Sequence, residues 1–364
     1  MRLVSPFLKH ILYPCLAKSG YLRRNAAAGP VVVTYHGILP AGYKGIDSAL
    51  DGALVSAESF RQQLHLLQAR YNIISPEQFL LWCESKQALP QRSVLLTCDD
   101  GLQNTLTDLL PVLQELGLSC LFFVTGASLG EQASILWYEE LYLLMLAAGS
   151  SFTLNLNDAG IRISVATPQQ KRSGWWELVK KLSQFNRDKR KEILERIREQ
   201  LGIPADWISK YVDDPILARR FLMLNPPGLR RLSAAGMCIG AHSLSHPVLS
   251  QAPEELAWSE ISESRSNLER GLGRLIWALA YPFGDAGSVT QRELEMAERA
   301  GFKCAFLNFG GGLGAANPRF ALPRIHVTAN MSIAEFEAHV SGFHQSLRQH
   351  FSSDANEPVT SLHA

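Results

Sequence analysis

Short apolar runs of strand length alternate with amphipathic runs of helix length along most of this 364-residue chain. Val31 to Tyr35 is typical of a buried strand, and Ser56 to Arg70 is typical of an amphipathic helix. Ser93 to Cys98 and Asn104 to Leu116 repeat this order, and the pattern resumes beyond residue 237. Repeated strand–helix units predict parallel strands in a closed or nearly closed barrel with helices outside it.

The alternation breaks between about residues 131 and 225. An aromatic start is followed by an alternating segment near Ser151 to Ser164, which predicts a hairpin, and by a charged helical region from Lys180 to Gln200. An inserted lid above the active face and a packing or oligomer module explain this stretch equally well. We therefore predict an amphipathic segment over 1–28, a barrel over 29–130 and 226–347, an inserted subdomain over 131–225 and a flexible tail over 348–364.

Composition limits the class of protein and its compartment. Hydrophobic residues make up 46% and charged residues 19%, and the net charge is +1, so nothing indicates a nucleic-acid partner. The six cysteines are far apart and form no C-x-x-C pair, which favours free thiols in a reducing compartment.

The first 24 residues interrupt their apolar positions with Lys9, Lys18 and Arg23, unlike a conventional signal peptide. No stretch approaches the ~18 apolar residues of a spanning helix. These features predict a cytoplasmic protein. We favour a first helix packed on its own domain, and the alternative is a basic amphipathic helix that contacts the inner membrane surface.

Two separated motifs bring acids and imidazoles to the ends of predicted strands. Asp99 and Asp100 follow the apolar run Ser93 to Cys98, and His242 and His246 follow the run that ends at Ala241. Sites gather at the carboxyl ends of parallel strands, so both motifs are expected at one mouth. Asp100, His242 and His246 can hold one divalent metal with a coordination position open. Asp99 then stays free to accept a proton.

These motifs resemble those of the polysaccharide deacetylases, carbohydrate esterase family four, whose domain is also called the NodB-homology domain. Thr97 to Gly101 matches Thr-Phe-Asp-Asp-Gly with Cys98 in place of the aromatic residue, and His242 to Pro247 matches His-Ser-x-x-His-Pro in full. The resemblance spans roughly residues 31–124 and 225–342. It implies an α/β fold, a distorted (β/α)7 barrel, interrupted here by a mostly helical insertion.

The resemblance also implies roles for residues. Asp99 corresponds to the general base, and Asp100, His242 and His246 correspond to the metal ligands. Zn²⁺ is the first expectation, and Co²⁺, Ni²⁺ or Mn²⁺ would also suit this ligand set. His326 is the best match for the late histidine that protonates the departing amine.

The third motif departs from the family pattern. Its arginine, which normally pairs with the base, is replaced by Ala280 in Ala280-Tyr281-Pro282-Phe283-Gly284. Arg324 is the candidate to supply the missing charge. The Phe283 amide is the candidate oxyanion donor, and the predicted substrate and oxyanion group consists of His36, Tyr281, Phe283 and Arg324. The Tyr-Pro-Phe-Gly form resembles a bacterial branch found with exopolysaccharide and lipopolysaccharide assembly.

We therefore expect a metal-dependent hydrolase that removes N-acetyl groups from an amino sugar, acting on a glycan precursor in surface polysaccharide or lipopolysaccharide biosynthesis. Two alternatives remain open. One is an amidase or deformylase that cleaves another carbon–nitrogen bond. The other is a sugar-binding homologue without activity, which the loss of the arginine at Ala280 favours and the retention of Asp99 opposes. The sequence does not indicate the oligomeric state.

Overall fold

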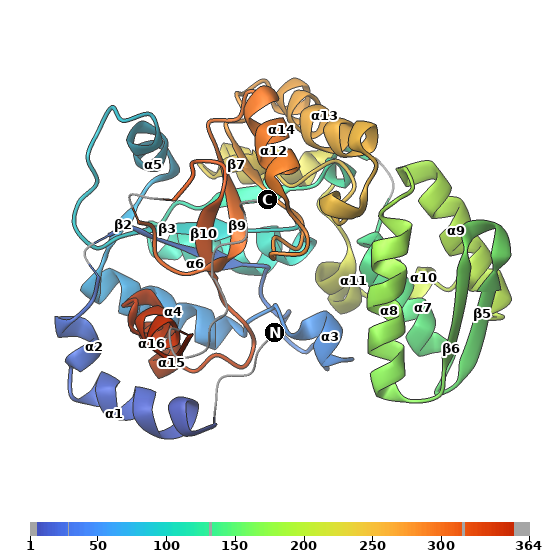
Figure 1. Cartoon of the computed structure of the whole chain (residues 1–364), viewed down its shortest axis with the longest axis horizontal. Helices are drawn as coiled ribbons and strands as arrows, with labels where there is room; N and C mark the ends of the chain where they lie inside the picture. The colour runs from blue at the N-terminus through green and yellow to red at the C-terminus, as the bar shows by residue number, and fades with distance from the viewer. Residues whose placement is uncertain (1–5, 28, 131–132, 315–316, 353–364) are drawn as a thin grey trace.

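Seven parallel strands close into a barrel, and an eighth, short strand pairs with the beginning of one of them (Figure 1). The computed structural model describes residues 6–27, 29–130, 133–314 and 317–352. In order around the barrel, the strands are β1 (Val31–Tyr35), β10 (Leu322–His326), β9 (Cys304–Gly310), β8 (Ala278–Ala280), β7 (Cys238–Ala241), β4 (Leu121–Val124) and β3 (Ser93–Cys98).

The barrel closes through parallel pairing of β1 with β3, from Val31 opposite Val94 to Tyr35 opposite Cys98. The other edge of β3 is shared, because β2 (Asn72–Ile74) pairs with its beginning and β4 pairs with its end. The register between β10 and β9 shifts between Leu322 and Arg324, which distorts the barrel at this point. The predicted (β/α)7 barrel is therefore confirmed.

Helices surround the barrel (Figure 1). They are α3 (Ser48–Asp51), α4 (Ala57–Arg70), α5 (Pro76–Cys83), η2 (Thr105–Leu109), α6 (Leu110–Glu115), η3 (Gly126–Leu129), α12 (Pro226–Ala234), η5 (Leu249–Gln251), α13 (Glu254–Leu272), α14 (Gln291–Arg299) and α15 (Ile333–Val340). Local signals set several of their ends. Ser75 and Gln78 form a capping box before α5, and Gly273 ends α13 with a left-handed φ of 64°.

Successive strand residues face opposite sides of the barrel wall. Leu95 and Phe123 belong to an interior cluster with Phe306, whereas Leu96 belongs to the layer that packs against the outer helices. Gly240 is required inside, because a Cβ there would lie 2.6 Å from the Phe123 ring. This alternation determines which side chains at the strand ends face the interior of the barrel.

Residues beyond β4 form a body beside the barrel, on the right of Figure 1. Its elements are α7 (Trp137–Ala147), β5 (Phe152–Leu156), η4 (Asn157–Ala159), β6 (Ile161–Val165), α8 (Pro168–Leu182), α9 (Arg187–Gln200), α10 (Ser209–Asp213) and α11 (Pro215–Phe221). The predicted hairpin is present as the antiparallel pair β5 and β6. The predicted charged helical region is divided between α8 and α9. Much of this body packs around an apolar cluster of its own, with Leu141, Leu154, Val179 and Ile193 at its centre. Residues 131 and 132, at the predicted start of the insertion, lie outside the described residues.

The predicted first helix consists of the short segments η1 (Leu8–Leu12), α1 (Tyr13–Lys18) and α2 (Tyr21–Arg24). They pack on α15 and α16 (Phe343–Ser352), with Tyr13 buried beside Ala338. Residues 348–352 of the predicted tail belong to α16, whose first residue, Phe343, packs against Tyr13. The rest of that tail, 353–364, and residues 1–5 lie outside the described residues. Within the described ranges, no helix combines the length and apolar character needed to cross a membrane.

One buried arginine joins the inserted body to the barrel. Arg220 on α11 is fully buried, and its guanidinium lies 2.9 Å from Asp51 on α3 and 2.9 Å from Glu139 on α7. Arg220 also donates 2.7 Å to the Leu50 carbonyl. Arg220 compensates the charge of both carboxylates. Its removal would leave two buried negative charges without this positive partner.

We therefore expect Arg220→Ala to lower the free energy of unfolding by about 3–5 kcal/mol, measured by urea denaturation. Arg219→Ala is the matched control, because Arg219 is partly exposed and pairs at 3.0 Å with Asp108. The control should cost less than about 1 kcal/mol. Equal losses in the two variants would contradict a special role for the buried cluster.

Candidate active site

The predicted site residues come from the carboxyl ends of five strands. Asp99 and Asp100 follow β3, His242 follows β7, His36 follows β1, and His326 ends β10. Phe283 follows β8 by three residues. Parallel strands in a closed barrel present these ends at one mouth, so residues distant in sequence converge there.

Asp100, His242 and His246 form a buried cluster that could hold a metal ion. One ligand atom from each lies within 4.8 Å of the others. The Nε2 atoms of His242 and His246 lie 3.5 and 3.3 Å from the same Asp100 oxygen, Oδ1. All three side chains are almost completely buried. A carboxylate and two imidazoles that face one another in this way suit a divalent transition metal.

The orientation of His242 supports this ligand set. Its Nδ1 lies 2.8 Å from the carbonyl oxygen of Ala280, which leaves Nε2 as the ring nitrogen that faces Asp100. Metal-binding histidines are commonly oriented by such a bond from the other ring nitrogen. Burial raises the pKa of Asp100, but the adjacent imidazoles of His242 and His246 outweigh it, and the pKa lies well below its usual range. The carboxylate is therefore ionised at neutral pH.

Asp99 is held separately by a bidentate ion pair. Nη1 and Nη2 of Arg324 donate to the two carboxylate oxygens at 2.8 and 2.6 Å. Burial raises the pKa of Asp99, but the charge of Arg324, followed by that of His242, lowers it below its usual value. Both side chains are almost fully buried. Asp99 is thus a fixed anion beside the candidate metal ligands.

The Arg324 guanidinium crosses the interior of the barrel to reach Asp99. Its Nε donates 2.8 Å to the Leu307 carbonyl, and its Nη1 also lies within 3.2 Å of the hydroxyls of Thr34 and Thr97. The Phe123 ring lies 5.4 Å from the guanidinium carbon. A cation from β10 therefore pairs with Asp99, whereas Ala280 on β8 offers none.

The loop of residues 242–247, here called the metal loop, has a strained backbone that buried polar contacts hold in place. Ser243 and His246 both have a φ of 59°, in the left-handed region. The Ser243 hydroxyl accepts the His246 amide at 2.9 Å, and Glu260 on α13 accepts the Ser245 amide at 2.7 Å. Non-glycine residues adopt such φ values mainly where the surroundings fix them, as at functional sites.

The inserted body also contacts this loop. Trp137 on α7 donates from Nε1 to the His246 carbonyl at 3.0 Å. Arg190 on α9 donates to the carbonyl and the hydroxyl of Ser245 at 3.1 and 3.2 Å. The Tyr138 ring lies 4.8 Å from the His246 ring. None of these residues was predicted to belong to the site. In the sequence, only the Trp137-Tyr138 pair at the start of the insertion could have indicated such a contact.

His36 and His326 lie against each other at the mouth, with ring centroids 4.6 Å apart. Nε2 of His326 is buried and has no hydrogen-bond partner within the described structure. Burial and the adjacent His36 lower the pKa of His326 to about 3. The ring is therefore neutral at neutral pH, which differs from the protonated state expected of a general acid.

The third-motif residues divide between the mouth and the barrel wall. Phe283 has a φ of 59°, and its ring lies 4.8 Å from the His246 ring. No described residue accepts a hydrogen bond from its amide, which leaves this donor free. Tyr281, predicted to contact substrate, is instead fully buried, and its hydroxyl donates 3.0 Å to the Phe320 carbonyl. We assign Tyr281 to the barrel wall.

Comparison with known proteins agrees with this architecture. A family model described as polysaccharide deacetylase matches residues 86–198 and 203–305, which is more than half of the chain. A search of curated proteins found no match.

Solved structures share the fold at low sequence identity. The Streptococcus pyogenes deacetylase PplD, solved in complex with acetate, has 19% identity and a TM-score of 0.54, over 86% of this chain and 99% of PplD. IcaB from Ammonifex degensii has 18% identity and a TM-score of 0.53, over 87% of this chain and 98% of IcaB. A polysaccharide deacetylase from Bacillus cereus has 14% identity and a TM-score of 0.51, over 86% of this chain and 69% of its own.

The ligand set predicts how metal content responds to substitution. Asp100→Ala and His242→Ala should each reduce bound zinc from about one ion per chain to near zero, because two ligands do not make a stable site. Asp99→Asn is the matched control and should keep its zinc, since Arg324 rather than the ligand cluster binds Asp99. Elemental analysis after dialysis measures the content. Full zinc in Asp100→Ala would rule out this site.

Proposed function

We propose that this chain, which belongs to the polysaccharide deacetylase family, is a metal-dependent enzyme that hydrolyses the N-acetyl group of an amino sugar. The observation that carries the proposal is the position of Asp99. It is an ionised carboxylate fixed by Arg324 beside a separate three-residue ligand cluster. A protein that only bound sugar would have no use for a fixed base at this position, so Asp99 favours catalysis over the binding alternative.

Asp99 is proposed to act as the general base. A divalent cation held by Asp100, His242 and His246 would supply Lewis acidity to the acetamide carbonyl and to a water molecule. Asp99 accepts a proton from the attacking water, and Arg324 keeps it ionised and correctly oriented until then. Arg324 is a positioning residue, because its donors are directed at Asp99 and at groups inside the barrel.

The free amide of Phe283 is proposed to stabilise the developing oxyanion. A backbone donor near a metal site adds electrostatic stabilisation as negative charge builds on the carbonyl oxygen. The Phe283 ring lies 5.3 Å from Tyr138 and 5.2 Å from Trp176, so the inserted body and the barrel form one aromatic wall there. Such a wall offers an apolar surface to a sugar ring beside the ligand cluster.

The departing nitrogen must receive a proton, and we propose that Asp99 returns the one it accepted. His326 was the expected acid from the sequence, but it makes no hydrogen bond to any described carboxylate, and its pKa is lowered to about 3. A neutral imidazole is a weak proton donor. His326 and His36 are instead proposed to line the acetamide side of the mouth.

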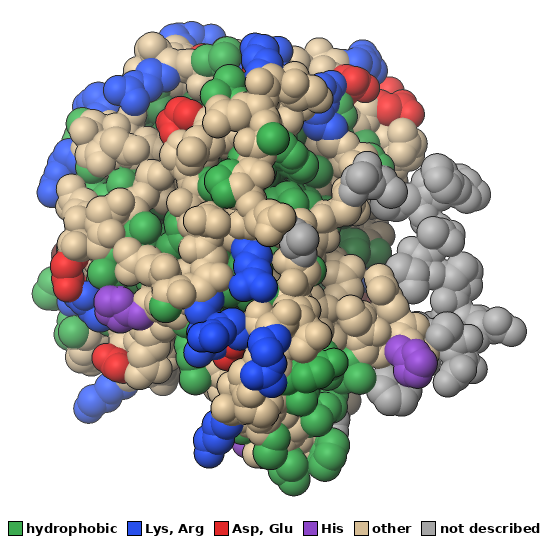
Figure 2. All heavy atoms as spheres, turned by 90° about the vertical axis from the view of Figure 1, so that its left-hand side faces the viewer, with side chains coloured by type: hydrophobic (Ala, Val, Ile, Leu, Met, Phe, Trp, Pro, Cys, Tyr) green, Lys and Arg blue, Asp and Glu red, His purple; other side chains and the backbone are tan. Residues whose placement is uncertain are grey.

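We propose a precursor of a surface glycan as the substrate, with peripheral contact to a membrane as one way to meet a lipid-linked sugar. Phe7, Ile11 and Tyr21 in the first helices are exposed, and Arg23, Arg70 and Arg92 line a nearby hollow of about 390 Å³. Figure 2 shows hydrophobic side chains at the lower edge of this face beside a group of Lys and Arg side chains. Exposed apolar residues next to cations are typical of peripheral membrane binding.

The reaction is tested with zinc-loaded protein and a panel of N-acetylated nucleotide sugars, lipid-linked sugars and chitin oligomers, by mass spectrometry for loss of an acetyl group. Asp99→Asn should lower kcat by about 10²–10⁴-fold while its zinc content stays unchanged. His326→Gln should lose much less, because it removes titration but retains hydrogen bonding. A loss in His326→Gln as large as that in Asp99→Asn would restore His326 as the acid. Full activity in Asp99→Asn would eliminate the proposed base.

The Arg324 pair predicts a change in pH dependence. Asp99 must be ionised to accept a proton, and Arg324 holds its pKa below the usual value. Arg324→Gln should raise that pKa and shift the acidic limb of kcat/KM upward by about 1–3 pH units. Arg324→Lys, which keeps the charge but not the bidentate bond, should shift it less. An unchanged limb in Arg324→Gln, with folding verified by circular dichroism, would contradict this role.

A further inference from the structure

Tyr138, at the start of the inserted body, carries a hydroxyl that bonds to no described residue. Other tyrosines of the chain donate to protein acceptors. Tyr43 donates 3.0 Å to Asp51, and Tyr281 donates 3.0 Å to the Phe320 carbonyl. A shielded tyrosine hydroxyl usually has such a partner. The Tyr138 ring is half-buried, but its hydroxyl is not among the enclosed polar atoms, so the hydroxyl borders accessible space. It is therefore a donor available to a ligand.

The Tyr138 ring lies beside the candidate ligand cluster. Its centroid is 4.8 Å from the His246 ring and 5.3 Å from the Phe283 ring. The ring also packs against the apolar cluster that contains Leu102, two residues after Asp100. Burial raises the pKa of Tyr138, and the charge of Asp100 raises it further, which agrees with a phenol close to that carboxylate. An ordinary phenol is already protonated at neutral pH, so the hydroxyl is a donor in any case.

Two tryptophans fix the backbone around Tyr138. Trp175 on α8 donates from Nε1 to the Tyr138 carbonyl at 2.8 Å. The preceding residue, Trp137, donates from Nε1 to the His246 carbonyl at 3.0 Å. The phenol is thus held in place before any ligand arrives. A donor that needs little reorganisation stabilises developing charge more effectively than one that must first be ordered.

The aromatic wall indicates which part of a substrate would meet this hydroxyl. Phe283 contacts both Tyr138 and Trp176, at 5.3 and 5.2 Å, whereas no ring contact joins Trp176 to His246 among the described residues. Tyr138 is therefore the part of the wall on the side of the ligand cluster. A sugar ring that packs on Phe283 and Trp176 would direct its acetamide toward Tyr138 and the cluster.

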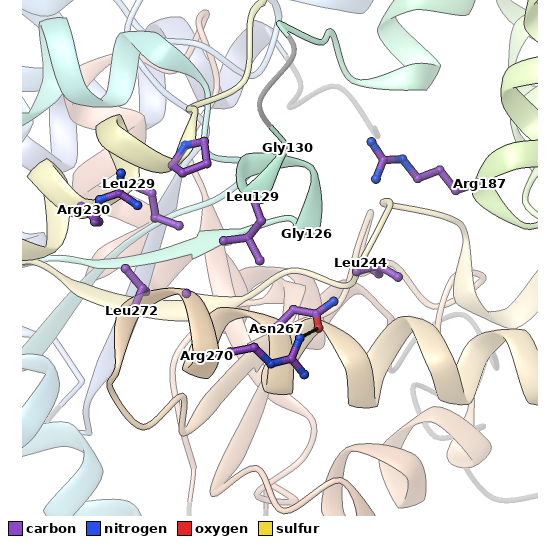
Figure 3. A pocket seen from close by; sticks show the side chains of 12 residues that line it. Gly126, Leu129, Gly130, Arg187, Leu229, Arg230, Leu244, Asn267, Arg270 and Leu272 are labelled. Atoms are coloured by element: carbon purple, nitrogen blue, oxygen red, sulfur yellow. Dashed lines mark hydrogen bonds between the residues drawn. The ribbon is translucent and has the colours of Figure 1, made fainter.

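A hollow of about 480 Å³ on another side of the metal loop does not offer these groups (Figure 3). Leu244 and Gly126 contribute to its wall, together with arginine and leucine side chains. Among the described residues that line it, there is no aromatic side chain and none of the candidate metal ligands. The acetamide is therefore expected at the barrel mouth, where Tyr138 lies, and not in this hollow.

We propose that Tyr138 is a catalytic residue that donates a hydrogen bond to the acetyl carbonyl oxygen as this oxygen becomes an oxyanion. The inference rests on the proposed deacetylation and adds a second donor to the Phe283 amide. In this step the water oxygen bonds to the acetyl carbon, an electron pair of the carbonyl bond moves to its oxygen, and Asp99 takes the water proton. Tyr138 keeps its own proton throughout. The inserted body thus contributes to the reaction as well as to the support of the metal loop.

Kinetics of zinc-loaded full-length protein test this role. Tyr138→Phe removes only the hydroxyl. Tyr142→Phe is the matched control, because Tyr142 lies one turn later on α7 and its buried ring packs 5.1 Å from Trp175. With the best substrate of the panel, Tyr138→Phe should lower kcat by about 10²–10³-fold and leave KM within about twofold, and the control should match wild type. A fall in kcat of less than about tenfold, or a rise in KM alone, would overturn the proposal.

Binding of a tetrahedral analogue separates this inference from the proposed function. The probe is glucosamine with a methylphosphonamidate in place of the acetamide, titrated by isothermal calorimetry. Tyr138→Phe should bind it at least about tenfold more weakly than wild type and Tyr142→Phe, with zinc content unchanged. Equal affinities in the three proteins would overturn the role of Tyr138 even where wild type deacetylates its substrate. A zinc-loaded wild type that deacetylates nothing in the panel would contradict the proposed function, and with it this role.

Discussion

The ion pair between Arg324 and Asp99 is the interaction on which the mouth of this barrel depends. A carboxylate buried in a barrel would ordinarily become protonated. The free-energy cost of removing its charge from water exceeds the stabilisation that a few neutral hydrogen bonds provide. Arg324 reverses this with two direct bonds, and threonine hydroxyls and a backbone carbonyl occupy its other donors. The barrel can therefore keep an anion ready at its centre, separate from the carboxylate that faces the two histidines.

The inserted body contributes directly to the candidate active site. Trp137 and Arg190 hold the backbone of the metal loop, and Tyr138 lies over His246. Arg220 attaches the same body to the barrel through two buried carboxylates. The strand ends therefore supply the candidate site residues, while helices from outside the barrel fix the loop that carries His242 and His246.

The sequence was sufficient to predict what depends on local pattern. The strand ends at Asp99 and His242 followed from apolar runs, and Arg324 was predicted to supply the charge that Ala280 lacks. Tyr281 lies in the barrel wall because alternation along β8 turns Ala280 inward and the next residue outward into the helical layer. The contacts of Trp137 and Arg190 could not be predicted, since they join residues 109 and 55 positions apart through packing that no local pattern records.

The support that the metal loop receives from the insertion has a consequence for the order of folding. Ser243 and His246 adopt left-handed backbone geometry that costs free energy by itself, and contacts from α7 and α9 help to maintain it. The barrel strands can pair before those helices dock, but the loop would then be free to relax. The candidate metal site is therefore expected to be among the last features that the folding chain completes, so that a partly folded molecule would lack the arranged ligand cluster.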